Sequence, residues 1–167
     1  VVSDNHGNRE VLETLFNHYR QSVDVMIHCG DSELSAQDSL WEGVEKVTGN
    51  CDYDNGYPKT LTIETPLDRI FVTHGHLYDV RFGLQTLSFK AAEEQADIVV
   101  FGHTHQIACE QVGPTLFLNP GSIEQPRGSI QEKSYCIIES TTDAFHVQYY
   151  RKDFTVISDL AFTFPKP

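Results

Sequence analysis

Seven side chains that can bind a metal ion follow short apolar segments of this 167-residue chain. Three offer oxygen and four offer imidazole nitrogen: Asp4, Asp31 and Asn50, and His6, His74, His103 and His105. Such ligands without a thiolate are typical of Mn, Fe, Ni or Zn and argue against a closed structural zinc site. Seven donors exceed the four of a tetrahedral zinc, and they suit two divalent ions that share one carboxylate. A two-metal centre can activate water and hold the attacking and leaving oxygens of a phosphoryl group.

The apolar segments that precede these residues have the length and composition of strands, and two helical patterns lie between them. Ligands of open α/β sheets bind beyond the carboxyl ends of the strands, so the seven side chains should converge there. Early strands alternate with helices and later strands form hairpins, which predicts an α/β domain with mixed sheets. The expected strands are 1–4, 23–28, 44–48, 60–64, 69–73, 97–101, 106–112, 115–118, 135–138 and 145–150, and the expected helices are 8–20 and 84–95.

The composition is that of one globular domain over residues 1–167, with 40% hydrophobic and 22% charged residues. Twelve basic against 24 acidic residues give a net charge of −12, which argues against a basic face for long nucleic acid. An acidic protein that binds phosphate needs a local reversal of sign, and a metal ion provides one. No apolar segment approaches the roughly 20 residues that would span a membrane. The four cysteines form no CxxC pair, which predicts reduced thiols in a cytoplasmic protein.

The two ends of the chain lead to further expectations. The sequence opens on Val1-Val2-Ser3-Asp4, and we expect the natural start and part of the first strand to precede it. The segment 154–164 carries many apolar side chains. We expect it to pack on its own domain, and a contact in a homodimer or larger homo-oligomer is the alternative.

The ordered motifs of the chain resemble those of the calcineurin-like metallophosphoesterases, and most closely those of the small YfcE-type phosphodiesterases. They run from residue 3 to residue 122 and so cover most of the domain. The motifs are SDNHGN (3–8), GD (30–31), GNCD (49–52), THGH (73–76), GHTH (102–105) and NPGS (119–122). The resemblance implies two packed mixed β-sheets flanked by helices, a four-layer αββα sandwich, with the site at the strand ends.

The resemblance also implies a role for each ligand. Asp4, His6 and His105 would bind one divalent ion, and Asn50, His74 and His103 would bind the other. Asp31 would bridge the two ions, and Asn50 would also meet the substrate. Mn²⁺ is the first expectation for both ions, and Ni²⁺, Fe²⁺ or Zn²⁺ suit the same donors.

Other polar residues in or near the motifs are candidates for proton transfer, ligand orientation or substrate binding. Cys51 stands where many superfamily members have a histidine that is thought to protonate the leaving group. A thiol beside two cations tends towards thiolate, which is a poor proton donor. General-acid catalysis would therefore be absent, or the proton would come from His76 or metal-bound water. Asp52 would orient a neighbouring ligand. Ser122 and Arg127 could bind the substrate phosphate, or they could serve a structural turn and an ion pair.

These observations predict a two-metal phosphodiesterase that hydrolyses a small phosphodiester by attack of metal-bound hydroxide, with esters of good leaving groups favoured. Two alternatives stay open. The first is a phosphomonoesterase that acts on a nucleotide or sugar phosphate with the same ligands. The second is a non-catalytic scaffold, as in a retromer subunit that resembles these enzymes but has an incomplete ligand set.

Overall fold

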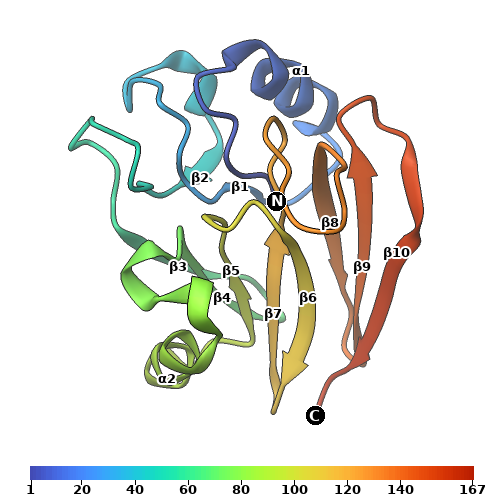
Figure 1. Ribbon diagram of the computed structural model, residues 1–167. Helices are drawn as coiled ribbons and strands as arrows, with labels where there is room; N and C mark the ends of the chain where they lie inside the picture. Colours follow the sequence, from blue (N-terminus) through green and yellow to red (C-terminus); the bar gives the residue numbers. More distant parts are fainter.

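The strands form a five-stranded sheet, a three-stranded sheet and a two-stranded pair. The two smaller groups join into a second layer that packs on the first, with one α-helix on each outer side (Figure 1). The computed structural model describes all residues from 1 to 167. The helices are α1 (Arg9–Tyr19) and α2 (Gln85–Glu93), with three short 3-10 turns, η1 (Ser39–Trp41), η2 (His76–Tyr78) and η3 (Val80–Phe82). The strands are β1 (Met26–His28), β2 (Val44–Lys46), β3 (Thr60–Glu64), β4 (Arg69–Thr73), β5 (Ile98–Val100), β6 (Ile107–Val112), β7 (Thr115–Pro120), β8 (Ser134–Ser140), β9 (Ala144–Arg151) and β10 (Val156–Pro165).

The first sheet has five strands in the order β3-β4-β5-β7-β6. Strands β4, β5 and β7 run parallel, and β3 and β6 pair antiparallel at the two edges. The carboxyl ends of the three parallel strands therefore lie at one edge of the sheet. This edge carries the loops that hold His74 and His103.

The second sheet is assembled through the amino-terminal residues. Strands β8, β9 and β10 are antiparallel, and β1 pairs parallel with β2. Val1 joins the two groups, because its amino group donates to the Cys136 carbonyl (2.8 Å) and its carbonyl accepts from the Cys136 N–H (3.0 Å). Val2 pairs in parallel with His28 on the other side. The chain thus forms the two mixed sheets that the motifs imply.

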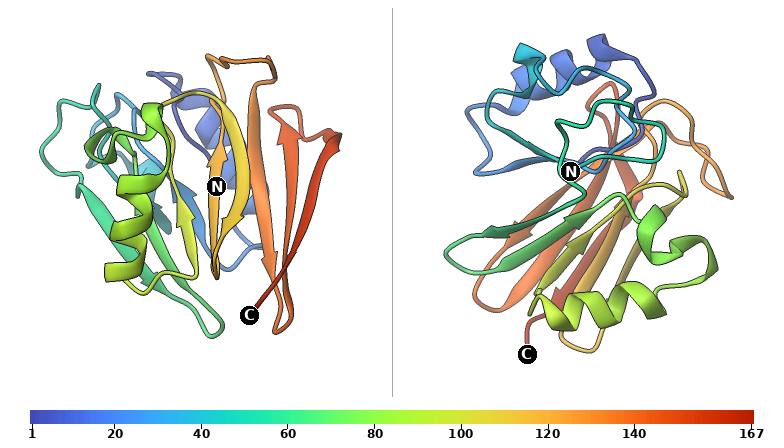
Figure 2. Two further views of the ribbon diagram at one scale, coloured as in Figure 1. Left: turned by 60° about the horizontal axis from the view of Figure 1, so that its bottom comes forward. Right: turned by 90° about the vertical axis from the view of Figure 1, so that its left-hand side faces the viewer.

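Strand alternation separates the interior into three apolar layers. In β4, Ile70 and Val72 pack between the sheets, whereas Phe71 packs under α2. Leu12 and Phe16 of α1 cover the outer face of the second sheet. Successive side chains of a strand point to opposite faces, so these apolar runs can be buried on both sides. Figure 2 shows α1 and α2 on opposite sides of the strands, which confirms the four-layer αββα sandwich.

Most expected elements form with small shifts in their ends, but the expected strand 1–4 is only a single bridge at Val2, and the expected strand 23–28 begins at Met26. Helix α1 begins one residue later than expected, because Asn8 caps it by accepting a hydrogen bond from the Val11 N–H (3.2 Å). The apolar tail forms β10 beside β9, and Ile157, Phe162 and Phe164 pack on the layer between the sheets. The prediction that the tail packs on its own domain is confirmed. No helix has the length and apolar character needed to cross a membrane.

Candidate metal centre

The seven predicted ligands lie at one edge of the sandwich, where strands of both sheets end. Asp4 and His6 follow the Val2 bridge, and Asp31 follows β1. Asn50 comes after β2, His74 comes directly after β4, and the loop beyond β5 carries His103 and His105. The structure therefore brings together residues that are up to 101 positions apart in the sequence.

Asp4 is the centre of the first group of ligands. It is fully buried, and its Oδ2 accepts hydrogen bonds from the Ser3 hydroxyl and the His103 N–H. Its Oδ1 has no hydrogen-bond partner. Three imidazole Nε2 atoms surround this oxygen: His105 at 3.1 Å, His6 at 3.7 Å and His74 at 3.9 Å. A buried carboxylate oxygen without a partner is costly, and a cation among these donors would compensate it.

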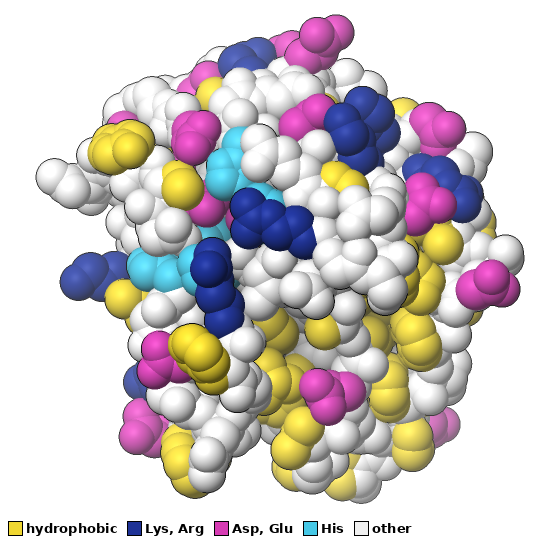
Figure 3. Space-filling model, viewed as in Figure 1, with side chains coloured by type: hydrophobic (Ala, Val, Ile, Leu, Met, Phe, Trp, Pro, Cys, Tyr) yellow, Lys and Arg dark blue, Asp and Glu magenta, His cyan; other side chains and the backbone are white.

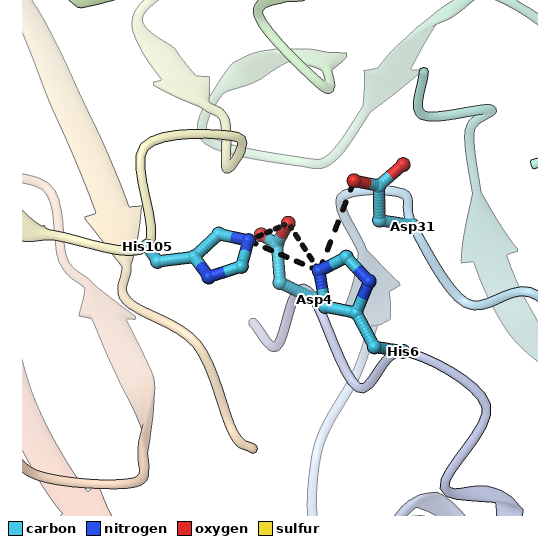
Figure 4. A group of neighbouring side chains, drawn as sticks. All are labelled: Asp4, His6, Asp31 and His105. Atoms are coloured by element: carbon cyan, nitrogen blue, oxygen red, sulfur yellow. Dashed lines mark hydrogen bonds and ion pairs between the residues drawn. The ribbon is translucent and has the colours of Figure 1, made fainter. Parts of the chain in front are cut away.

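The first group consists of Asp4, His6, Asp31 and His105, each with one ligand atom within 4.8 Å of the others (Figure 4). The Nε2 atoms of His6 and His105 are 3.0 Å apart. The His6 Nε2 lies 3.9 Å from the Asp31 Oδ2. Two imidazole nitrogens and two carboxylate oxygens that converge in this way fit a divalent cation.

The second group lies on the other side of Asp31. The His74 Nε2 is 3.3 Å from the Asp31 Oδ2 and 3.2 Å from the Asn50 Oδ1. Because the same carboxylate oxygen of Asp31 faces His6 and His74, it stands between the two groups. The ring of His103 lies 5.2 Å from that of His74, centroid to centroid.

His103 differs from the other histidines in what it binds. Its Nε2 accepts a hydrogen bond from the Nε of Arg81 (3.1 Å). A guanidinium can only donate, so this bond uses the ring lone pair that a metal ion would also use. His103 can therefore bind Arg81 or a cation through Nε2, but not both.

Hydrogen bonds to backbone carbonyls orient two of the ligand rings. The Nδ1–H of His74 donates to the Cys29 carbonyl and that of His105 donates to the Gln125 carbonyl, both at 2.7 Å. In each ring the proton on Nδ1 leaves the lone pair of Nε2 directed at the carboxylates. Metal-binding histidines are commonly held in this tautomer by such a bond.

The charges of the site favour the forms that bind cations. Burial alone would raise the pKa of Asp4, but the His105 and His6 side chains outweigh it and hold that pKa far below its usual value. Burial also opposes ionisation of Asp31, and His74 lowers its pKa nevertheless. The Asp4 carboxylate, whose Oδ1 lies 3.7 Å from the His6 Nε2, raises the pKa of His6 to about 8, so a cation would displace a proton there. Burial, His74 and Arg81 lower the pKa of His103 to about 4.

Five of the seven ligands have left-handed backbone conformations. These conformations cost roughly 1 kcal/mol or more for residues other than glycine, and they concentrate at functional sites. The φ angles are 57° at Asp4, 41° at His6, 55° at Asp31, 69° at His103 and 60° at His105. Two glycines allow the loops to approach, because a Cβ at Gly49 would overlap the Asp31 carboxylate and one at Gly102 would overlap Ser3.

Comparison with known proteins identifies the family of the chain. Residues 1–143 match the model of the calcineurin-like phosphoesterase superfamily domain. The chain belongs to this superfamily. It is 38% identical over 160 residues to the "Probable metallophosphoesterase YsnB" of Bacillus subtilis, covering 96% of this chain and 94% of that protein. It is 32% identical over 153 residues to the phosphodiesterase YfcE of Escherichia coli, covering 76% and 79%.

Two solved structures share the fold over nearly the whole chain. A protein from Streptococcus pneumoniae described as a predicted phosphoesterase has a TM-score of 0.97 and 41% identity, covering 99% of this chain and 95% of its own. Vps29 of Entamoeba histolytica has a TM-score of 0.75 at 21% identity, covering 100% of this chain and 98% of its own. At this identity the likeness shows only that the fold is the same. The predicted resemblance to the calcineurin-like metallophosphoesterases and their fold is thus confirmed.

Other superfamily motif residues hold the ligand loops in place. The Asp52 carboxylate accepts hydrogen bonds from the N–H groups of Gly49 (2.6 Å), Asp31 (2.9 Å) and Glu33 (2.7 Å). These three contacts tie the loop of Asp31 to the loop of Asn50. The Cys51 N–H donates to the Asp31 Oδ1 (2.8 Å), and burial and Asp31 raise the pKa of the Cys51 thiol to about 11. Without cations this thiol is therefore protonated at neutral pH.

The NPGS motif lies beneath the site. The Asn119 amide donates to the Gly102 carbonyl (2.9 Å) and the Thr104 hydroxyl (3.0 Å) of the loop that carries His103. Ser122 is fully buried, and its hydroxyl donates to the Asp4 carbonyl (2.7 Å). Ser122 positions Asp4 and has no surface to offer a substrate. These contacts favour the structural role of Ser122 over the candidate role in phosphate binding.

Arg127 and His76 border the ligand cluster. Arg127 is exposed, and its N–H donates to the His105 carbonyl (3.0 Å). The His76 ring is 5.4 Å from that of His74 and 6.1 Å from that of His103. Its Nδ1 is buried without a hydrogen-bond partner. Neither side chain belongs to the first group of ligands.

Sequence reasoning assigned no role to His28 and did not single out Arg81. His28 is fully buried, accepts a hydrogen bond from the Gly30 N–H (3.1 Å) and donates to the Asn5 amide oxygen (2.8 Å). It thereby links the loop of Asp31 to the segment between Asp4 and His6. No local pattern around His28 or Arg81 indicates these contacts, because their partners lie at least 22 residues away or across a tight turn.

Proposed function

We propose that this chain is a two-metal-dependent phosphodiesterase that hydrolyses a small phosphodiester. The observation that carries the proposal is the unpaired, buried Oδ1 of Asp4, which faces three imidazole nitrogens. The name of the related YfcE protein supports the diester as substrate.

The donor set assigns one role to each ligand. Asp4, His6 and His105 would hold one ion, Asn50, His74 and His103 would hold the other, and Asp31 would bridge them. Mn²⁺ is the proposed ion, and Ni²⁺, Fe²⁺ or Zn²⁺ suit the same donors. Two such ions supply Lewis-acid stabilisation of phosphoryl oxygens and activate a water molecule.

The remaining residues of the site would position the substrate and move protons. Asn50 is exposed, so its amide can also meet the substrate. His76 is the imidazole beside the second group that no ligand role uses, and we assign it proton transfer to the leaving group. No Ser, Cys or Asp of the site has the adjacent base that an enzyme nucleophile needs, so water attacks phosphorus directly.

The proposal is tested by paired hydrolysis assays on metal-stripped protein. Bis(p-nitrophenyl) phosphate and p-nitrophenyl phosphate are compared with Mn²⁺, Ni²⁺, Zn²⁺ and Mg²⁺ added back. Asp31→Asn should abolish turnover and weaken the binding of both ions, and the exposed Asp24→Asn is the matched control. Preference for the monoester would identify a phosphomonoesterase. Tight metal binding without turnover of either ester would identify a scaffold.

A substitution at Cys51 tests whether general-acid catalysis of leaving-group departure is weak in this protein. Replacement Cys51→His restores the residue found in many superfamily members. It should accelerate the cleavage of diesters with poor leaving groups more than that of nitrophenyl esters. An unchanged rate with poor leaving groups would remove Cys51 from the explanation of substrate preference.

A further inference from the structure

Arg81 and Arg127 are cations without a carboxylate partner in a chain with twice as many acidic as basic residues. Arg81 binds only the ring of His103, and the side chain of Arg127 makes no hydrogen bond. Six other cationic residues of the chain form ion pairs: Arg9, Arg69, Lys90, Lys133, Arg151 and Lys166. Two exposed guanidinium groups left free beside a metal centre are well placed to bind an anion.

Both arginines line the same cavity, which has a volume of about 450 Å³. This volume lies in the range of roughly 300–1,000 Å³ that is typical of small-molecule sites. The loop that carries His103 and His105 also supplies Phe101 and Thr104 to the cavity wall, so the cavity adjoins the ligand cluster. Figure 3 shows cationic side chains directly beside the histidines on this face.

The lining of the cavity combines three kinds of side chain. Val80, Leu84 and Phe101 supply apolar wall. Glu110 lies five residues beyond His105, and its strand β6 leads away from the ligand loop. A carboxylate there repels an anion and accepts hydrogen bonds from hydroxyl or amino groups. The cavity thus offers two cations, apolar surface and a carboxylate acceptor.

We propose that this cavity binds the organic group of the substrate and that Arg81 and Arg127 bind phosphate oxygens at the end next to the histidines. The inference rests on the proposed function. A nucleoside matches the lining, because it joins flat apolar faces to hydroxyl and amino donors. The arginines can bind the scissile phosphate or a second phosphate attached to it, since both offer the same oxygens.

Arginine suits this position for a physical reason. Its planar guanidinium donates two parallel hydrogen bonds to a phosphate, and such bonds to charged acceptors are strong. Arg81 is free to make this exchange, because one bond to His103 is all that holds its side chain.

Kinetics with two diesters that share a leaving group test the proposal. Thymidine 5′-monophosphate p-nitrophenyl ester carries a nucleoside, whereas methyl p-nitrophenyl phosphate carries only a methyl group. Arg81→Gln and Arg127→Gln should each raise KM about 10-fold for both esters, because each removes a charged hydrogen-bond donor. Lys152→Gln removes an exposed cation elsewhere and should change neither KM.

A steric variant tests the cavity itself. Ala108 lines it from β6, and Ala108→Phe would fill it. We expect a larger KM for the thymidine ester and little change for the methyl ester. An equal loss on both esters would place the nitrophenyl group in the cavity, and that also supports a binding pocket. Unchanged KM values for both esters in folded Ala108→Phe or Ala108→Leu would overturn the proposal.

Binding without turnover separates this inference from the proposed function. Metal-stripped protein is titrated with thymidine 5′-monophosphate and with thymidine by calorimetry. Both arginine variants should weaken binding of the nucleotide about 10-fold and leave that of thymidine unchanged. Equal nucleotide affinity in wild type and variants would refute the role of the arginines. Normal nucleotide binding without hydrolysis of any ester would refute only the proposed function.

A nucleoside diphosphate ester identifies which phosphate the arginines bind. If the arginines bind a second phosphate, Arg81→Gln should raise KM more for uridine diphosphate glucose than for thymidine 5′-monophosphate p-nitrophenyl ester, which has one phosphate. If they bind the scissile phosphate, the two KM values should rise by the same factor. Both results support the pocket, and no change with either ester contradicts it.

Discussion

The two halves of the candidate metal centre differ in how firmly the protein holds their ligands. In the first half Asp4 is fully buried and His105 is 3% exposed, and the His105 ring is tied to a backbone carbonyl. In the second half His74 is likewise buried and tied to a backbone carbonyl, but Asn50 is exposed and the His103 lone pair accepts a hydrogen bond from the exposed Arg81. Two ligands of the first half, Asp4 and His105, thus lie in the protein interior, whereas Asn50 and His103 of the second half lie nearer the surface that a substrate approaches.

This difference indicates a division of labour within one site. Fixed donors with a single arrangement bind a cation without the entropic cost of ordering side chains. Donors at an exposed edge can exchange partners when a ligand arrives. We expect the first half to retain its ion and the second half to control how ion and substrate are exchanged.

A matched pair of histidine variants would break this comparison most strongly. His105→Gln should lower kcat roughly 1000-fold or more, since a lost metal site removes several kcal/mol of transition-state stabilisation. His103→Gln should cost roughly 10- to 100-fold and be partly restored by excess Mn²⁺. Steady-state kinetics and metal content by mass spectrometry measure both effects. Equal losses in the two variants would show that the halves are equivalent.

The acid stability of the protein tests how the first half is supported. Burial lowers the pKa of His28 from 6.5 to about 4, so the folded protein excludes a proton that the unfolded chain binds. Stability from neutral His28 is complete above about pH 6.5 and is lost as the pH falls towards 4, by about 3 kcal/mol in total.

The measurement is the free energy of unfolding in urea between pH 4 and 7. His28→Gln should unfold more easily at pH 7 and should show a smaller loss on acidification than the wild type. His103 also has a lowered pKa, so the difference between the two proteins isolates the contribution of His28. Parallel pH profiles would exclude His28 as a source of acid lability.

The smallest expected effect concerns the contact beneath Asp4. Ser122→Ala removes the hydroxyl that donates to the Asp4 carbonyl, and this should lower the free energy of unfolding by about 1–2 kcal/mol. The exposed Ser22 also donates to a carbonyl, that of Tyr19, and Ser22→Ala should change stability far less. Thermal unfolding of the two variants measures the contrast. A larger effect at Ser22 would show that burial of the contact does not decide its value.

Local patterns were sufficient to predict much of the fold. The period of apolar residues predicted α1 and α2 to within two residues at either end. The apolar runs of β4, β5 and β7 alternate between two buried faces, and this is why they lack a polar face in the sequence. The 3-10 turns η2 and η3 escaped prediction, because each is only three residues long and is set by contacts of the ligand loop.

The sequence by itself determined which donors exist and that each follows a strand, because residue type and strand periodicity are local properties. Only the tertiary structure decided the left-handed conformations of five ligands, the burial of Ser122 and the bond between Arg81 and His103. These features depend on contacts between distant segments, as when the His103 N–H reaches the Asp4 carboxylate across 99 residues. Such contacts arise only when both sheets have packed and closed the loops over one edge.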